Sequence, residues 1–222
     1  MPTDIKFCGL TRSQDAVYAA ELGAAFVGVI LAGGPRNLEP RRAADVLANV
    51  PATVRRVGVF ADQNADEIAR VAELARLDVV QLHGSHDPGR IEQLRRLFRG
   101  QVWRVVRVPV TLPADFQIAG LEGEPGDGLV LDAFVQGTLG GTGVALPWEG
   151  LAPQVAALRR TLSGAPVVLA GGLESGNVKR AIQAIAPDVV DVSSGVESAP
   201  GIKDHARMRV FRDAALAATV PV

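Results

Sequence analysis

Two kinds of hydrophobic pattern alternate along the 222-residue chain. One kind is a short run of β-branched and other apolar residues, which is typical of a strand that is buried on both faces. The other kind is a longer stretch in which apolar residues recur every three or four positions, which predicts a helix with one buried face. The runs that predict strands are 4–8, 25–31, 54–60, 78–82, 102–108, 128–132, 166–170 and 188–192.

Predicted helices occupy most of the intervals between these strands. The interval after the fifth strand, 109–126, is an exception, because it is rich in proline and glycine. Only a turn or two of helix near 114–121 is expected there. The stretches with a helical period are 12–22, 40–49, 64–76, 87–99, 147–162, 175–185 and 204–217.

This alternation indicates an α/β protein with a parallel sheet that helices cover. Eight strand–helix units close naturally into a (β/α)8 TIM barrel, here with a short or irregular fifth helix. The alternative is an open, doubly wound sheet, which would not require glycine signals around all the strand ends. No linker divides the chain, so residues 1–222 are predicted to form a single domain.

Composition narrows the classes of partner. A net charge of −1 and a pI of about 6.3 provide no field that attracts nucleic acid or an anionic membrane. The single cysteine cannot form an internal disulfide, and the first residues do not have the pattern of a signal peptide. A cytoplasmic protein is therefore expected, and both a monomer and a homodimer remain open.

The active site of such a barrel forms at the carboxyl ends of the strands. Glycine and reactive side chains do follow the predicted strands. After the seventh and eighth strands stand Gly171-Gly172 and Ser194-Gly195. Glycines allow the backbone to approach an anion, and this end of the barrel commonly binds phosphate. Phosphate binding is predicted there, although ordinary tight turns would also explain these residues.

Cys8 ends the first strand and is the candidate base. Thr11 and Gln14 have the spacing of a capping box, which would open a helix just after Cys8. The positive end of that helix would favour a thiolate. The alternative is an inert, buried cysteine. Lys6 shares the inward face, where it would pair with an acid such as Asp191 or aid the thiolate.

The candidate acid is Asp132, which ends the sixth strand. Partial desolvation there would raise its pKa and keep a proton on it, although a loop-anchoring role is the alternative. Arg36 could grip a carboxylate with both arms of its guanidinium, or it could be a solvated loop residue. His83 could bond the substrate or order a loop. Gly141, within Gly-Gly-Thr-Gly at 140–143, could belong to a lid or to a second anion-contacting turn.

Other chemistries lack support in the sequence. No His, Cys and Asp set has the spacing of metal ligands, so no metal is predicted. No nucleotide-binding motif is present, and no cofactor is expected.

These segments occur in an order that resembles the phosphoribosylanthranilate isomerases of tryptophan biosynthesis, from one end of the chain to the other. One departure is that Gly34 and Pro35 precede Arg36 where many relatives have Ser-Pro. The matching segments are KFCGLT, VGVFAD, DVVQLHG, GLVLD followed by GGTG, LAGGL and DVSSGVESAPGIKD.

The resemblance implies a cofactor-free Amadori rearrangement of N-(5-phosphoribosyl)anthranilate. Asp132 would protonate the ribose ring oxygen and open the ring to a Schiff base. Cys8 would then remove the proton on C2. Arg36 would hold the anthranilate carboxylate, and the backbone around the two glycine turns would hold the phosphate.

Three other functions fit the sequence less well. A Schiff-base lyase would need an activated lysine at a strand end, but Lys6 lies within its strand and Lys179 and Lys203 lie elsewhere. A non-catalytic phosphosugar-binding barrel would have no need for both Cys8 and Asp132. Isomerisation of an aliphatic aminoaldose would usually employ two aspartates, which the cysteine argues against.

Overall fold

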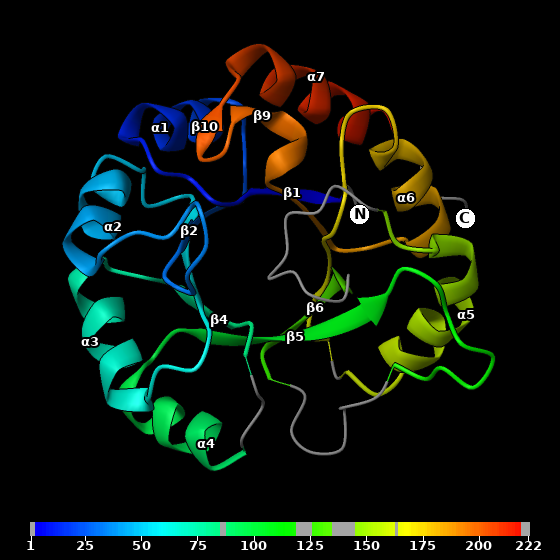
Figure 1. Cartoon of the computed structure of the whole chain (residues 1–222), viewed down its shortest axis with the longest axis horizontal. Coiled ribbons are helices and arrows are strands. Elements are labelled where there is room, and N and C mark those ends of the chain that lie inside the picture. The colour runs from blue at the N-terminus through cyan, green and yellow to red at the C-terminus, as the bar shows by residue number, and fades with distance from the viewer. Residues whose placement is uncertain (1–2, 85–87, 119–125, 135–144, 163, 219–222) are drawn as a thin grey trace.

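The computed structural model describes residues 3–84, 88–118, 126–134, 145–162 and 164–218. Its strands close into a parallel barrel in chain order, because each pairs with its sequence neighbour and β8 pairs back with β1. Figure 1 looks into this barrel and shows the helices around it. The predicted TIM barrel is therefore confirmed. The barrel strands are β1 (Asp4–Phe7), β2 (Phe26–Ile30), β3 (Arg55–Phe60), β4 (Val79–Leu82), β5 (Gln101–Pro109), β6 (Gly128–Phe134), β7 (Val167–Leu169) and β8 (Val189–Val192).

The helices lie where the hydrophobic period predicted them, with the ends shifted by a few residues. Between β5 and β6, the described residues 110–118 contain a turn in which Phe116 N–H donates to Pro113 O, and they contain no helix. Within the described ranges, no helix is long and apolar enough to cross a membrane. The helices are α1 (Ser13–Glu21), α2 (Pro40–Leu47), α3 (Ala65–Leu74), α4 (Pro88–Leu97), α5 (Trp148–Arg159), α6 (Val178–Ile185) and α7 (His205–Leu216).

Local signals explain several helix starts. Pro40 occupies the first turn of α2, where its fixed φ is helical and its missing N–H costs nothing. Asn64 and Glu67 form a reciprocal capping box at α3. The Asp204 carboxylate accepts from two backbone N–H groups at the start of α7.

Apolar side chains pack on both faces of the barrel strands. Inward-facing side chains, including Phe26, Trp103 and Val130, fill the barrel. Outward-facing side chains pack against the helices in a larger core. Successive residues of β1 show the alternation: Lys6 points into the barrel, while Phe7 packs edge-on against Phe211 of α7 with the ring centroids 6.2 Å apart. Phe7 therefore faces outward, toward the helices.

The amino-terminal end of the barrel carries a repeated clamp. An aspartate just before each of β4, β6 and β8 exchanges two hydrogen bonds with a residue of the preceding strand. Its backbone N–H donates to that residue's carbonyl, and its carboxylate accepts from the same residue's N–H. The pairs are Asp78 with Arg56 (2.9 and 2.7 Å), Asp127 with Val102 (2.8 and 2.8 Å), and Asp188 with Val167 (2.9 and 2.8 Å).

Removing one clamp is expected to destabilise the fold. Asp127→Ala leaves the N–H of the buried Val102 without its acceptor. An unsatisfied donor of this kind lowers the free energy of unfolding by about 1–2 kcal/mol. Urea denaturation would measure the loss. Asp127→Asn, which keeps an acceptor oxygen, and Asp115→Ala, on an exposed turn, are the controls. Equal stability of Asp127→Ala and Asp115→Ala would contradict a structural role for the clamp.

The segment after β8 folds against the side of the barrel. It consists of the 3₁₀ turn η1 (Ser194–Val196) and a hairpin of β9 (Glu197–Ala199) and β10 (Ile202–Lys203). Figure 1 shows this hairpin beside α1 and α7. Arg12 Nη2 donates to Lys203 O at 2.9 Å, which ties the hairpin to the start of α1.

Candidate active site

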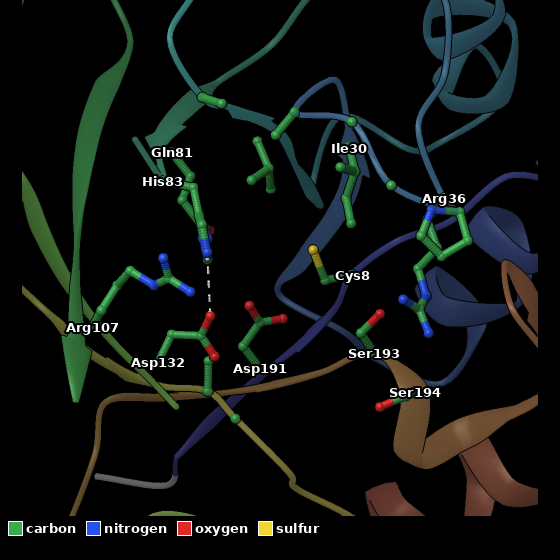
Figure 2. Close-up of a pocket in the computed structure, with 18 of the residues that line it drawn as sticks. Cys8, Ile30, Arg36, Gln81, His83, Arg107, Asp132, Asp191, Ser193 and Ser194 are labelled. Atoms are coloured by element: carbon green, nitrogen blue, oxygen red, sulfur yellow. Dashed lines mark ion pairs between the residues drawn. The ribbon is translucent and has the colours of Figure 1, made fainter. Parts of the chain in front are cut away.

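A pocket of about 880 Å³ opens at the carboxyl ends of the strands. The loops after the strands bring together side chains that are far apart in sequence, as Figure 2 shows. Gly195 is not among the lining residues, and Gly141 lies outside the described residues. The predicted site residues that line the pocket are Cys8, Arg36, His83, Asp132, Gly171, Gly172 and Ser194.

Cys8 follows β1 and faces the pocket with 6% of its surface exposed. Its N–H donates to Val192 O at 2.9 Å, which fixes the backbone between β1 and β8. Gly28 on β2 leaves room for the thiol. A Cβ at Gly28 would lie only 3.0 Å from Cys8 Sγ and 3.3 Å from Lys6 Cε. A glycine at this position of β2 therefore lets both side chains share one face of the barrel.

The predicted helix-stabilised thiolate is wrong. Helix α1 begins at Ser13, and its N-cap Arg12 makes no side-chain cap. Thr11 instead donates its hydroxyl to Gly201 O in the hairpin. Burial raises the pKa of the Cys8 thiol above its ordinary value, and the Lys6 charge only partly opposes this. The protein without substrate therefore holds Cys8 mainly as the neutral thiol.

Lys6 and Asp191 form a buried ion pair beneath the pocket, as predicted. Lys6 Nζ lies 2.6 Å from Asp191 Oδ2, and the Lys6 side chain is fully buried. Burial would lower the pKa of Lys6, but Asp191 and Cys8 outweigh burial and raise it. Asp191 Oδ1 has no hydrogen-bond partner in the described part of the chain. Asp191 lines the pocket, but this oxygen itself is buried.

Asp132 lies near the end of β6 and lines the same pocket, beside Asp191 in Figure 2. Burial, helped by the Asp191 charge, raises the pKa of Asp132 to about 6. The predicted desolvation of this carboxyl is thus confirmed. His83 Nε2 lies 3.5 Å from Asp132 Oδ2, the contact drawn dashed in Figure 2. Near neutral pH, a part of Asp132 keeps its proton, which is what a general acid requires.

Arg36 reaches the pocket from the loop after β2. Its Nε donates to Glu197 Oε1 at 2.8 Å, and its Nη2 donates to Glu197 Oε2 at 2.6 Å. The guanidinium therefore does grip a carboxylate with two arms, but the carboxylate belongs to the protein. A ligand carboxylate would have to use the remaining edge of the guanidinium.

The glycine turns after β7 and β8 pack on each other. Gly171 and Gly172 have φ of +84° and +63°, a region that favours glycine, and both line the pocket. A Cβ at Gly195 would lie 2.0 Å from Leu173 O. Gly195 thus allows the η1 turn to contact the loop after β7, although it does not face the pocket itself. Ser194 in that turn does line the pocket.

Five further polar residues line the pocket that the sequence did not assign to ligand contact: Gln81, Arg107, Asp191, Ser193 and Asp62. Gln81 and Asp191 each lie in an otherwise apolar strand, and a polar residue at such a position is the signal that would have found them. Figure 2 shows the Arg107 guanidinium directed toward Asp132 and His83. The Arg107 charge lowers the pKa of Asp132 and so limits the effect of burial.

The lysine requirement of a Schiff-base lyase is not met by this pocket. None of its described lining residues is a lysine. Lys6 is paired with Asp191, Lys203 is paired with Glu197, and Lys179 is exposed on α6. Across the described ranges, no three His, Cys, Asp or Glu side chains are grouped so that they could hold a metal ion.

A candidate acid and a candidate base in one polar pocket, at the carboxyl ends of a closed parallel barrel, define an enzyme of the (βα)8-barrel class. A known protein family matches almost the whole chain. The model described as N-(5'-phosphoribosyl)anthranilate isomerase matches residues 5–214. The chain belongs to this family.

Individual relatives agree over the whole barrel. The isomerase of Pseudomonas aeruginosa strain LESB58 is 39% identical over 212 residues, which are 95% of this chain and 93% of the relative. That of Chromohalobacter salexigens is 40% identical over 94% of this chain and 92% of the relative. The crystal structure of the Thermotoga maritima isomerase has a TM-score of 0.81 at 31% identity and covers 96% of this chain and 98% of its own.

Proposed function

We propose that Cys8 is the general base and Asp132 the general acid in the isomerisation of N-(5'-phosphoribosyl)anthranilate. This isomerisation, a step of tryptophan biosynthesis, is the reaction of the family. The product is 1-(2-carboxyphenylamino)-1-deoxyribulose 5-phosphate, and one related isomerase was crystallised with the reduced form of this compound. The observation that carries the proposal is that a thiol and a carboxyl with a raised pKa line one pocket.

In the proposed first step, Asp132 donates its proton to the ribose ring oxygen. The C1–O bond breaks, and the anilino nitrogen forms a protonated Schiff base with C1. Cys8, as the thiolate, then takes the proton from C2, and the electron pair of that bond neutralises the iminium. The resulting enolamine tautomerises to the ketone. The cycle ends with the proton on Cys8 instead of Asp132, so one internal proton transfer resets the pair.

Ligand anions are assigned to two parts of the pocket. The phosphate is placed at the backbone of Gly171-Gly172 and the Ser194-Gly195 turn, which is the usual phosphate site of this fold. The substrate carboxylate is assigned to the edge of Arg36 that does not face Glu197. His83, next to Asp132, is assigned a hydrogen bond that orients the acid or the ribose.

Genetic rescue tests the proposed function directly. The wild-type chain is expected to restore growth without tryptophan to a strain that lacks this isomerase. The Cys8→Ala variant is expected to fail at equal expression, and the exposed-site variant Glu149→Gln is expected to succeed. Failure of the folded wild-type protein to rescue growth, together with no turnover of the substrate in vitro, would contradict the proposal.

We further propose that residues 1–222 form a single domain and that the protein is cytoplasmic. It is expected to need no cofactor and to be a monomer or a homodimer. Light scattering after size-exclusion chromatography distinguishes those two states.

A further inference from the structure

Glu197 is a buried carboxylate at the edge of the pocket, and its partners are two cations. Its side chain is 5% exposed. One oxygen, Oε1, accepts from Arg36 Nε and from Lys203 Nζ, both at 2.8 Å. The other, Oε2, accepts from Arg36 Nη2 at 2.6 Å. Burial would raise the pKa of Glu197, but the hydrogen bonds and charges of Arg36 and Lys203 outweigh burial and lower it. Glu197 is therefore ionised.

These contacts leave one edge of Arg36 for a ligand. Nε and one hydrogen of Nη2 face Glu197, while Nη1 makes no hydrogen bond within the described residues. The stem of Arg36 is also confined. A Cβ at Gly9 would lie 2.7 Å from Arg36 Cδ, so the side chain passes directly over the Gly9 backbone. Arg36 lines the pocket and is thus held at its stem by Gly9 and at its head by Glu197, while Nη1 remains unused by these contacts.

Lys203 alters the net charge of the group formed by Arg36 and Glu197. Its side chain is fully buried, and Nζ donates to Glu197 Oε1 and to Ser193 O at 3.0 Å. An Arg36–Glu197 pair alone would be neutral, so it would attract an incoming carboxylate only weakly. Burial lowers the pKa of Lys203, and the Glu197 charge and hydrogen bond oppose this. With the Lys203 ammonium added, the group carries two positive charges and one negative charge. The attraction of Arg36 for an anion is then not cancelled by the residue that holds it.

We propose that Glu197 and Lys203 are positioning residues that set the specificity of the pocket for a substrate bearing an aromatic carboxylate. Glu197 aims the guanidinium of Arg36, and Lys203 compensates the charge of Glu197. This inference rests on the proposed function, in which Arg36 binds the carboxylate of the substrate. It adds two residues that touch neither the substrate nor the reacting atoms.

The test uses two ligands that differ only in the carboxylate. One is reduced 1-(o-carboxyphenylamino)-1-deoxyribulose 5-phosphate, and the other is the same compound with a plain phenylamino group. Calorimetry gives the dissociation constant of each, and their ratio is the carboxylate preference. Arg36→Met is expected to abolish the preference. Glu197→Gln and Lys203→Met are each expected to reduce it about tenfold, the loss typical of one displaced or uncompensated charged hydrogen bond. Affinity for the phenylamino ligand should stay within about twofold in all variants.

The measured preferences distinguish a wrong assignment of Arg36 from a wrong positioning role of Glu197 and Lys203. If Arg36→Met keeps the preference, the assignment of Arg36 in the proposed function is wrong, and this inference is overturned with it. If Arg36→Met abolishes the preference but Glu197→Gln and Lys203→Met weaken both ligands equally, only the positioning role is overturned. Glu149→Gln, the same substitution at an exposed ion pair on α5, is the matched control and should leave both constants unchanged.

Glu197→Asp keeps the test decisive if Glu197→Gln fails to fold. Aspartate retains the charge but withdraws the carboxylate by one methylene, so it draws the guanidinium out of its position. A partial loss of the carboxylate preference, with normal affinity for the phenylamino ligand, is expected. An unchanged preference in Glu197→Asp would show that charge alone suffices and would overturn the positioning role.

Discussion

Asp132→Asn is expected to lower kcat by at least about 10²-fold, the lower end of what a general acid contributes. Asparagine has nearly the same shape as aspartate but has no acidic proton to give to the ring oxygen. Steady-state assay of the isomerisation measures the loss. The dissociation constant of the reduced product analogue should change little, because the phosphate and carboxylate sites remain intact.

The loss should not come from unfolding. The pKa of Asp132 is raised to about 6 in the folded chain, so this carboxyl binds its proton more tightly when folded than when unfolded. Ionisation of Asp132 therefore costs stability as the pH rises past the unfolded value, and the full cost remains above about pH 6. The neutral asparagine removes this cost, so Asp132→Asn should be at least as stable as the wild type at pH 8. Full activity in this folded variant would refute the acid role.

Cys8→Ser is expected to cause a loss of at least about 10²-fold in kcat, the scale of a missing general base. A serine hydroxyl occupies nearly the same space as the thiol but is a far weaker acid, so it supplies almost no anion to take the proton from C2. The kinetic assay and the binding control are the same. Turnover close to that of the wild type would end the case for Cys8 as the base.

The residual activities of the two variants should change with pH in opposite directions. The residual activity of Asp132→Asn depends on the Cys8 thiolate, so it should rise about tenfold per pH unit below the pKa of the thiol. The residual activity of Cys8→Ser depends on protonated Asp132, so it should fall above about pH 6. If a residue had a purely structural role, its variant would not show this pH dependence.

The kcat/KM of the wild type should not change with pH between about pH 6 and the raised pKa of Cys8. The productive pair, thiolate with carboxylic acid, holds one proton, as does the more abundant pair of thiol with carboxylate. Their ratio therefore does not change with pH. Activity is expected to fall below about pH 6, where both groups are protonated, and above the raised pKa of Cys8, where neither is.

Much of this site could be predicted from the sequence because barrel topology converts a position in the chain into a position in space. A residue that ends a strand must reach the carboxyl end of the barrel. For this reason the sequence alone predicts that Cys8, His83, Asp132 and the glycine turn after β7 share one pocket, and they do. The alternation of β1 likewise predicted that Lys6 points inward.

The rest depended on contacts between segments that are remote in the chain. Arg36 and Glu197 are 161 residues apart, and no local pattern pairs them. The Thr11 hydroxyl bonds Gly201 in the hairpin rather than capping α1, because a tertiary partner replaced the local one. The pKa of Cys8 depends on how completely the thiol is buried, which the sequence does not specify.

The burial of Cys8 also affects its chemical durability. Peroxides and alkylating reagents attack thiolates they can reach, whereas Cys8 is 6% exposed and its pKa is raised. Its sulfur lies against Gly28, where even an added Cβ would be only 3.0 Å away, so the oxygens of a sulfinic acid would be crowded there. The packing that raises the pKa of this thiol therefore also protects it from oxidation.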